Sequence, residues 1–463
     1  MLRITSLLLL ALSMVACGDD DASMDSSVPM DGGFDGLSID AGPGDSGPDE
    51  DGGPDVDGGP DAGPVVSACD GLEAILSPID EGAQLALIST DFTSSAVSVV
   101  SRGGTTAADW ITSGTTAPSL TATLGGDVVF PTEASPAGQL IIIDRFGKNV
   151  VTNLCLSGGV IGQLNVGTDS FGGNPHDVAV TGPDTAWVTR YDPNTAPGAE
   201  PEDAGSDVIG FNPVTMERNG MRIDLSAFGG TVSGMEGDAV VDVAIAARPD
   251  RMVLANENTL VVGLDRLPGD QAGAARGFGP GQVALVNLTT LEVTAVDLPG
   301  GANCGQVARF GTDIMVACKG YSTVGFGGPG VRETSGIYRL AVSDDGVGSI
   351  TAMWQPGEDE LVAVWSIVAV DTDKIVGLAL GDFGAGTSDE IVLVDLTAGT
   401  ATSLWESEGA FSMGQGVWFD DMFHVGHTAG EDAEVVSVTL EGVESFTNYT
   451  DSLPSYNLTT LQN

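Results

Sequence analysis

The feature that most constrains this chain is a unit of short apolar segments that repeats from residue 80 onward. The segments are separated by turns rich in Gly, Asp, Pro and Thr, and many alternate apolar with polar residues, as β-strands do. A polar residue followed by a short apolar strand opens each unit, at Gln84, Ser119, Asp177, Asp242, Gln306, Ser366 and Gln415. Seven units with room for four strands each predict an all-β fold, a seven-bladed β-propeller of four-stranded antiparallel blades over residues 67–463.

An aspartate follows every opening position except the first, after six to eight residues. We interpret it as the turn between the first and second strands, because an Asp side chain bonds to nearby backbone N–H groups. These aspartates are Asp127, Asp184, Asp250, Asp313, Asp373 and Asp421.

Several segments resemble the YVTN-type propeller repeat. They are Ala-Trp-Val-Thr-Arg at 186–190, after Asn-Pro-His-Asp-Val-Ala-Val at 174–180, and the third strands at 283–289 and 392–397. The resemblance covers about residues 80–460 and holds blade by blade. Its motifs specify packing and turns, so it implies architecture and not a particular activity.

The N-terminus resembles a bacterial lipoprotein signal. Arg3 precedes a short leucine-rich run, and Ala16 precedes Cys17. The run is too short to span a bilayer, so we expect cleavage after residue 16 and lipidation of Cys17, with plain secretion as the alternative. The expected location is the cell envelope of a Gram-negative-type bacterium, on the outer membrane or facing the periplasm.

Residues 17–66 have the composition of a disordered tether. After Cys17 they hold 14 Asp and Glu, no Lys or Arg, and repeated Gly-Pro-Asp units. Like charges repel and apolar residues are few, so we expect an extended spacer. A calcium loop at 55–58 would need a closing glutamate that is missing.

The charge balance limits the partners. With 65 Asp and Glu against 16 Lys and Arg, the net charge is −49, and no basic cluster is present to bind nucleic acid. We expect a monomer that meets the membrane through its lipid and binds a protein or a glycan.

Four further cysteines suggest two disulfides in an exported chain. Cys304 and Cys318 are the first pair, because the repeat places them at the same end of two adjacent antiparallel strands. Cys69 and Cys155 then pair by subtraction.

Propeller geometry predicts where a site would lie. The first strand starts and the second strand ends on the same face of the disc, so the seven opening residues should form a ring there beside His176. Arg190, Lys319 and His427 end second strands on this face, and either of the first two could hold a carboxylate or sulfate. Three long loops also leave this face, at 191–206, 257–281 and 319–335, which is typical of a binding surface. The candidate binding residues are Gln84, Asp177, Asp242, Gln306, Gln415, Arg190, Lys319 and His427.

Two functions follow from these patterns. The first is a non-enzymatic lipoprotein that binds a partner through the long-loop face. The second is a lactonase-like hydrolase, since YVTN-like propellers are similar to lactonases with an axial metal. In that case Glu133, Asp177, Asp242 and Glu257 would hold Ca²⁺, and His176 would be the general base, although a hydrogen bond between blades is the alternative role of His176.

Overall fold

A computed structural model describes residues 32–33, 68–79, 82–101, 104–168, 171–270, 275–321, 329–356, 364–379, 381, 387–410, 412–428, 433–449 and 453–462. The predicted signal peptide, Cys17 and all of the predicted tether except Gly32 and Gly33 lie outside these residues. Within them the fold is nearly all-β, with three short helical segments: η1 (Pro201–Asp203), η2 (Ser226–Phe228) and α2 (Pro329–Thr334). No helix in this part of the chain is long and apolar enough to cross a membrane.

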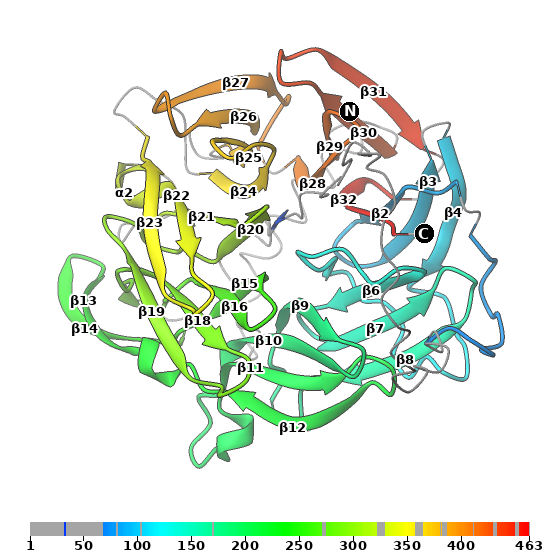
Figure 1. Cartoon of the computed structure of the whole chain (residues 1–463), viewed down its shortest axis with the longest axis horizontal. Helices are drawn as coiled ribbons and strands as arrows, with labels where there is room; N and C mark the ends of the chain where they lie inside the picture. The colour runs from blue at the N-terminus through cyan, green and yellow to red at the C-terminus, as the bar shows by residue number, and fades with distance from the viewer. Residues whose placement is uncertain are drawn as a thin grey trace, which may run out of the picture.

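The strands form antiparallel sheets arranged around a centre, as in a propeller (Figure 1). In the sheets built of four strands that follow one another in chain order, the first strand lies nearest the centre and the last lies outermost. Three of the sheets are β5 (Val128–Val129), β6 (Gln139–Asp144), β7 (Val150–Cys155) and β8 (Val160–Asn165); β9 (Pro175–Gly182), β10 (Thr185–Pro193), β11 (Gly205–Asn212) and β12 (Glu217–Ile223); and β15 (Pro249–Asn256), β16 (Thr259–Leu264), β18 (Gly281–Asn287) and β19 (Val293–Leu298).

The next sheets follow in chain order. They are β20 (Gln306–Phe310), β21 (Asp313–Lys319), β22 (Ser335–Val342) and β23 (Gly348–Trp354); β24 (Val364–Ala369), β25 (Lys374–Ala379), β26 (Glu390–Asp395) and β27 (Thr400–Glu406); and β28 (Met413–Phe419), β29 (Met422–His427), β30 (Ala433–Val438) and β31 (Glu444–Tyr449). The two-residue β1 (Gly32–Gly33) pairs in parallel with β24.

The ring is closed by the C-terminal strand. β32 (Ser455–Thr460) is the inner strand of a sheet whose other strands, β2 (Leu85–Thr90), β3 (Ser95–Ser101) and β4 (Gly104–Thr112), come from the N-terminal end. Leu87 pairs with Leu458 in this ladder. The two ends of the propeller are therefore joined by backbone hydrogen bonds within one sheet.

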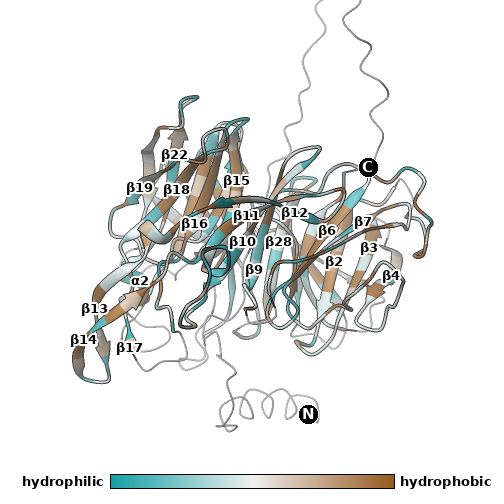
Figure 2. Ribbon diagram, turned by 90° about the horizontal axis from the view of Figure 1, so that it is seen from below, coloured by the Kyte–Doolittle hydropathy of each residue, from teal (hydrophilic) through white to brown (hydrophobic). Residues whose placement is uncertain are grey.

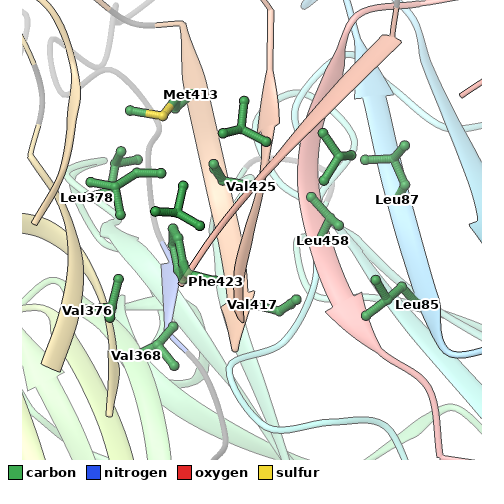
Figure 3. Packing of buried hydrophobic residues seen from close by; sticks show 14 of the residues in the cluster. Leu85, Leu87, Val368, Val376, Leu378, Met413, Val417, Phe423, Val425 and Leu458 are labelled. Carbon is green, nitrogen blue, oxygen red and sulfur yellow. The ribbon is translucent and has the colours of Figure 1, made fainter. Parts of the chain in front are cut away.

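The core lies between neighbouring sheets. One cluster joins Val368 and Leu378 of β24 and β25, Phe423 of β29, Leu458 of β32 and Leu87 of β2, all 0–1% exposed (Figure 3). Burying both faces of each sheet explains why many strands are almost continuously apolar.

Two disulfides are present, and both predicted pairs are confirmed. Cys304, two residues before β20, is bonded to Cys318 of β21. Cys69 and Cys155 join the N-terminal segment to β7. Such bonds fit a protein outside the cytoplasm.

Three strand assignments from the sequence are wrong. Gln84 precedes β2, which is the second strand of its sheet. Ser119 does not open a strand; the inner strand of the following sheet is β5, at Val128–Val129. Asp242 lies on β14 (Ala239–Ile245), which pairs with β13 (Gly230–Glu236) in a separate three-stranded sheet completed by β17 (Ala275–Arg276). This hairpin has the alternation of a blade strand, so only tertiary pairing shows which sheet it joins.

Candidate functional site

The ends of three second strands meet at one place on the disc. Tyr191, Asp265 and Lys319 occupy equivalent positions, because the N–H of each donates to the carbonyl of a residue one to three places before an inner strand. Those acceptors are Asn174, Arg248 and Asn303, with φ of 47°, 48° and 59°. The shared backbone geometry brings side chains from three successive sheets together.

Asp250 is the centre of this cluster. Its carboxylate is fully buried and accepts hydrogen bonds from Gln306 Nε2 at 2.9 Å and Lys319 Nζ at 2.8 Å, and His176 Nδ1 lies 2.9 Å from its other oxygen. Lys319 also lies 3.3 Å from Asp265, which accepts a bond from the Tyr191 hydroxyl at 2.9 Å. The prediction that Asp250 is a turn residue is therefore wrong.

His176 is held from two sides. Its ring stacks on that of Tyr191, with centroids 3.9 Å apart and an angle of 5° between the planes. Its bond to Asp250 connects β9 to β15, and the residue is 4% exposed. The side chain thus joins one sheet to the next.

The electrostatics of the cluster favour a charged Asp250. Burial alone would raise the pKa of this carboxyl, but Lys319, His176 and Arg251 lower it well below the usual value. Asp177 differs, because burial raises its pKa and the Arg251 guanidinium offsets only part of that effect.

Asp177, Glu133 and Arg251 tie the inner strands to one another. Asp177 accepts bonds from the N–H groups of Thr132 at 2.8 Å and Met252 at 2.6 Å. Glu133 accepts from the N–H of Leu254 at 3.0 Å. Arg251 donates to the carbonyl of His176 at 2.8 Å. These polar side chains serve the packing of the centre.

Arg190 is bound to carboxylates of this chain. It donates to both oxygens of Asp207 at 2.8 Å, and it also bonds to the carbonyl of Glu202. Both Arg190 and Lys319 are buried and ion-paired, so we do not propose either as a ligand for an external anion.

The four carboxylates predicted to hold calcium do not come together. Asp242 is exposed on β14, and Glu257 is exposed in the turn between β15 and β16, which is the opposite end of that hairpin from Asp250. The described residues contain no group of three or more His, Cys, Asp or Glu arranged to hold a metal ion. The four predicted calcium ligands therefore do not form one site.

Of the other predicted binding residues, Gln84 does not lie where the sequence placed it. Gln415 and His427 do, because Gln415 is near the start of the inner strand β28 and His427, at the end of β29, pairs with Met413. The carbonyl of Gln84 accepts from Leu461 after the end of β32, so Gln84 lies on the face opposite Asp177. Gln415 is buried and its N–H donates to Asn457 at 2.6 Å. His427 is buried, with Nδ1 3.2 Å from Glu434 and its ring edge-on to Trp405.

The sequence contained a signal for the central residues that its repeat pattern did not identify. Arg-Pro-Asp-Arg-Met at 248–252 has the same form as Asn-Pro-His-Asp-Val at 174–178, with a left-handed residue before a proline that opens the inner strand. Aligning the two prolines would have placed Asp250 and Arg251 in the centre, in place of Asp242.

Long connections gather on the face above this cluster. They run between β10 and β11, between β16 and β18, between β21 and β22, and, through β13 and β14, between β12 and β15. Figure 2 shows β13, β14, β17 and α2 on the same side of the disc.

Contacts join these connections into one surface, which we call the long-loop face. Met235 of β13 pairs with Arg276 of β17, and the ring of Phe278 lies 5.6 Å from that of Tyr321. Arg248 bonds to Asp192 at 2.7 Å. The long-loop face therefore belongs to three neighbouring sheets.

No family model and no curated protein matches the chain. Solved structures with a similar fold include a putative 6-phosphogluconolactonase from Bacteroides fragilis (10% identity, TM-score 0.49, covering 82% of this chain and 98% of the other). A hypothetical selenium-binding protein from Sulfolobus tokodaii has 9% identity and a TM-score of 0.48, covering 82% and 93%. A putative TolB from Agrobacterium tumefaciens has 10% identity and a TM-score of 0.36, covering 71% and 90%. Similarity at this level says nothing about what the chain binds.

Proposed function

We propose that the protein is a surface- or periplasm-exposed lipoprotein whose propeller is a binding scaffold that uses the long-loop face. Residues 1–16 are the signal, Cys17 carries the lipid, and residues 18–66 hold the domain away from the membrane. The sheet of β32, β2, β3 and β4 and the six sheets that follow it around the ring, ending with β28–β31, are seven blades of the YVTN type. The observation that carries the proposal is the gathering of four long connections on one face of a repeat scaffold.

Buried ion pairs give that face a rigid base. Arg190, Arg248, Arg251 and Lys319 all lie beneath it and are 0–3% exposed. Each has carboxylates of this chain within 4.0 Å. Sites that bind partners work best when loops stand on a fixed frame.

The same pairs leave few cations on the outer surface, and they do not offset its excess of carboxylates, because each buried cation is already neutralised by a carboxylate of its own pair. The chain has only 16 Lys and Arg, and several of them are buried in ion pairs. A surface of this kind repels anionic membranes and favours partners with basic or neutral groups.

Site-specific photo-crosslinking tests the proposal. A photo-reactive amino acid is placed at Ala199, which is exposed in the loop between β10 and β11, and at Val347, which is 63% exposed in the turn between β22 and β23 on the opposite face. In the producing bacterium we expect cross-linked partners from Ala199 and none from Val347. Equal cross-linking from both positions, or cross-linking from Val347 alone, would contradict the proposal.

A further inference from the structure

The strand β14 is the edge strand of its sheet on the long-loop face, among the strands that the structure describes. It pairs with β13 residue by residue from Ala239 to Ile245, without irregularity. Near its end, the carbonyl of Ala244 accepts a bond from the N–H of Gly269 at 3.1 Å on the side away from β13. Over residues 239–243, no described strand pairs with that side.

The direction of the Ala244 bond shows which backbone groups face outward. The N–H and C=O of one residue in an antiparallel strand point to the same edge, and successive residues alternate. Ala244 points away from β13, so Asp242 and Val240 do the same. Their backbone groups are the ones available to a further strand.

Natural proteins protect such edges with charged side chains, Pro or bulges; β14 has no Pro and no bulge, and Asp242 is its one charged residue. Its sequence is Ala-Val-Val-Asp-Val-Ala-Ile. Val240 is 72% exposed, the highest value for a large hydrophobic side chain in the described part of the chain. Among the outer strands, β4, β8, β12, β23 and β27 have ladders interrupted by register shifts, whereas β19 and β31 pair without interruption, as β14 does.

The charge around the edge indicates what can pair with it. Glu236, Asp238 and Asp242 are exposed, and residues 230–245 contain no Lys or Arg. A second copy of this chain would bring the same carboxylates and a net charge of −49 to the contact. A partner strand with basic side chains would complement the edge.

We propose that the outer edge of β14, residues 239–243, binds an extended segment of a partner protein by strand addition. The segment places Lys or Arg beside Asp242 and a β-branched residue beside Val240. Main-chain hydrogen bonds supply affinity, and the alternate side chains supply specificity. The inference rests on the proposed function, because it names the partner class for the long-loop face.

The test uses the purified chain and a fluorescent hexapeptide that alternates Lys and Val. A second peptide of equal charge is N-methylated at alternate residues, so that it cannot complete a ladder. We expect the first peptide to bind with a rise in anisotropy and to slow hydrogen exchange at the Val240 and Asp242 amides, and the second to bind at least about tenfold more weakly. Equal binding of both peptides overturns the inference in favour of charge attraction alone.

Variants locate the site. Val240→Pro removes an outward N–H that β13 does not use, and Asp242→Lys reverses the charge; each should weaken binding about tenfold or more. Glu441→Lys, an exposed residue in the turn between β30 and β31, is the matched charge control and should bind normally. Equal weakening by Asp242→Lys and Glu441→Lys would contradict the site.

Two further readouts keep the outcome clear. If Val240→Pro lowers the melting temperature, Val240→Thr is used in its place. Hydrogen exchange at the amides of residues 240 and 242 is then the readout of peptide binding. A dimer in sedimentation that Val240→Pro dissociates would show a second copy on this edge and overturn the inference. If the peptide fails while Ala199 still cross-links to partners, the proposed function stands and the docking edge does not.

Discussion

The buried carboxylate of Asp250 offers the sharpest test of how the centre is held together. We expect Asp250→Asn to destabilise the fold strongly, because the substitution removes a carboxylate 2.8 Å from the Lys319 ammonium, and Lys319 is only 3% exposed. The asparagine side chain also has an NH₂ group where the aspartate has an oxygen, and this donor would face either His176 or the Lys319 and Gln306 donors.

The magnitude follows from burial. Removing one partner of a buried ion pair costs about 3–5 kcal/mol, because the other charge stays desolvated. Asp373→Asn, which removes a carboxylate from Arg339 in a pair whose side chains are 39% and 21% exposed, is the control and should cost about 1 kcal/mol or less. The double variant Asp250→Asn with Lys319→Met should cost less than the sum of its parts.

Guanidinium unfolding at pH 7, followed by tryptophan fluorescence, measures these differences. The pH dependence adds a second check. The pKa of Asp250 is lowered in the folded state, so its stabilisation is present above the ordinary value near 3.8 and is lost as pH falls toward the folded value. A cost for Asp250→Asn below about 1 kcal/mol, or an unchanged acid limb of the stability curve, would refute this account.

Three further predictions concern other parts of the chain. Burial raises the pKa of Asp144 from 3.8 to about 7, so the free energy of unfolding should fall as pH rises between these values, and Asp144→Asn should remove that fall when unfolding is compared at pH 5 and pH 8. Replacing Cys69 and Cys155 by Ala opens a bond that spans 86 residues and should cost about 4–5 kcal/mol by chain entropy, measured by guanidinium unfolding; no loss would contradict that estimate. Cys17→Ser should move the protein from the membrane pellet to the soluble fraction in a carbonate wash, and retention in the pellet would argue against a lipid anchor.

Much of the architecture was predictable from local pattern. Alternation and turn residues identify β-strands because side chains point to opposite faces with a period of two. The cysteine pairs were also predictable, since Cys304 and Cys318 lie at one end of adjacent strands. The positions of Arg190 and Lys319 at the ends of second strands followed from the same repeat, although their burial did not.

The site was less predictable, because the repeat does not distinguish a blade strand from an inserted one. The 239–245 segment has the alternation of an inner strand, and it displaced the true inner strand at 249–256 in the prediction. Asp242 therefore took the place that belongs to Asp250, and the expected calcium ligands were dispersed. The register of β15 against β16, and the contacts of Asp250 across three sheets, show which strand is the inner one.

The amino-acid sequence alone determined that this chain makes short antiparallel strands, that its surface is acidic, and how its cysteines pair. These properties depend on the order of neighbouring residues and on composition. The tertiary structure alone decided that β32 closes the ring, that Asp250 holds Lys319, and that β14 is the edge strand of its sheet among the described strands. These depend on contacts between residues far apart in the chain, where several pairings satisfy the same local pattern and only packing in three dimensions selects one.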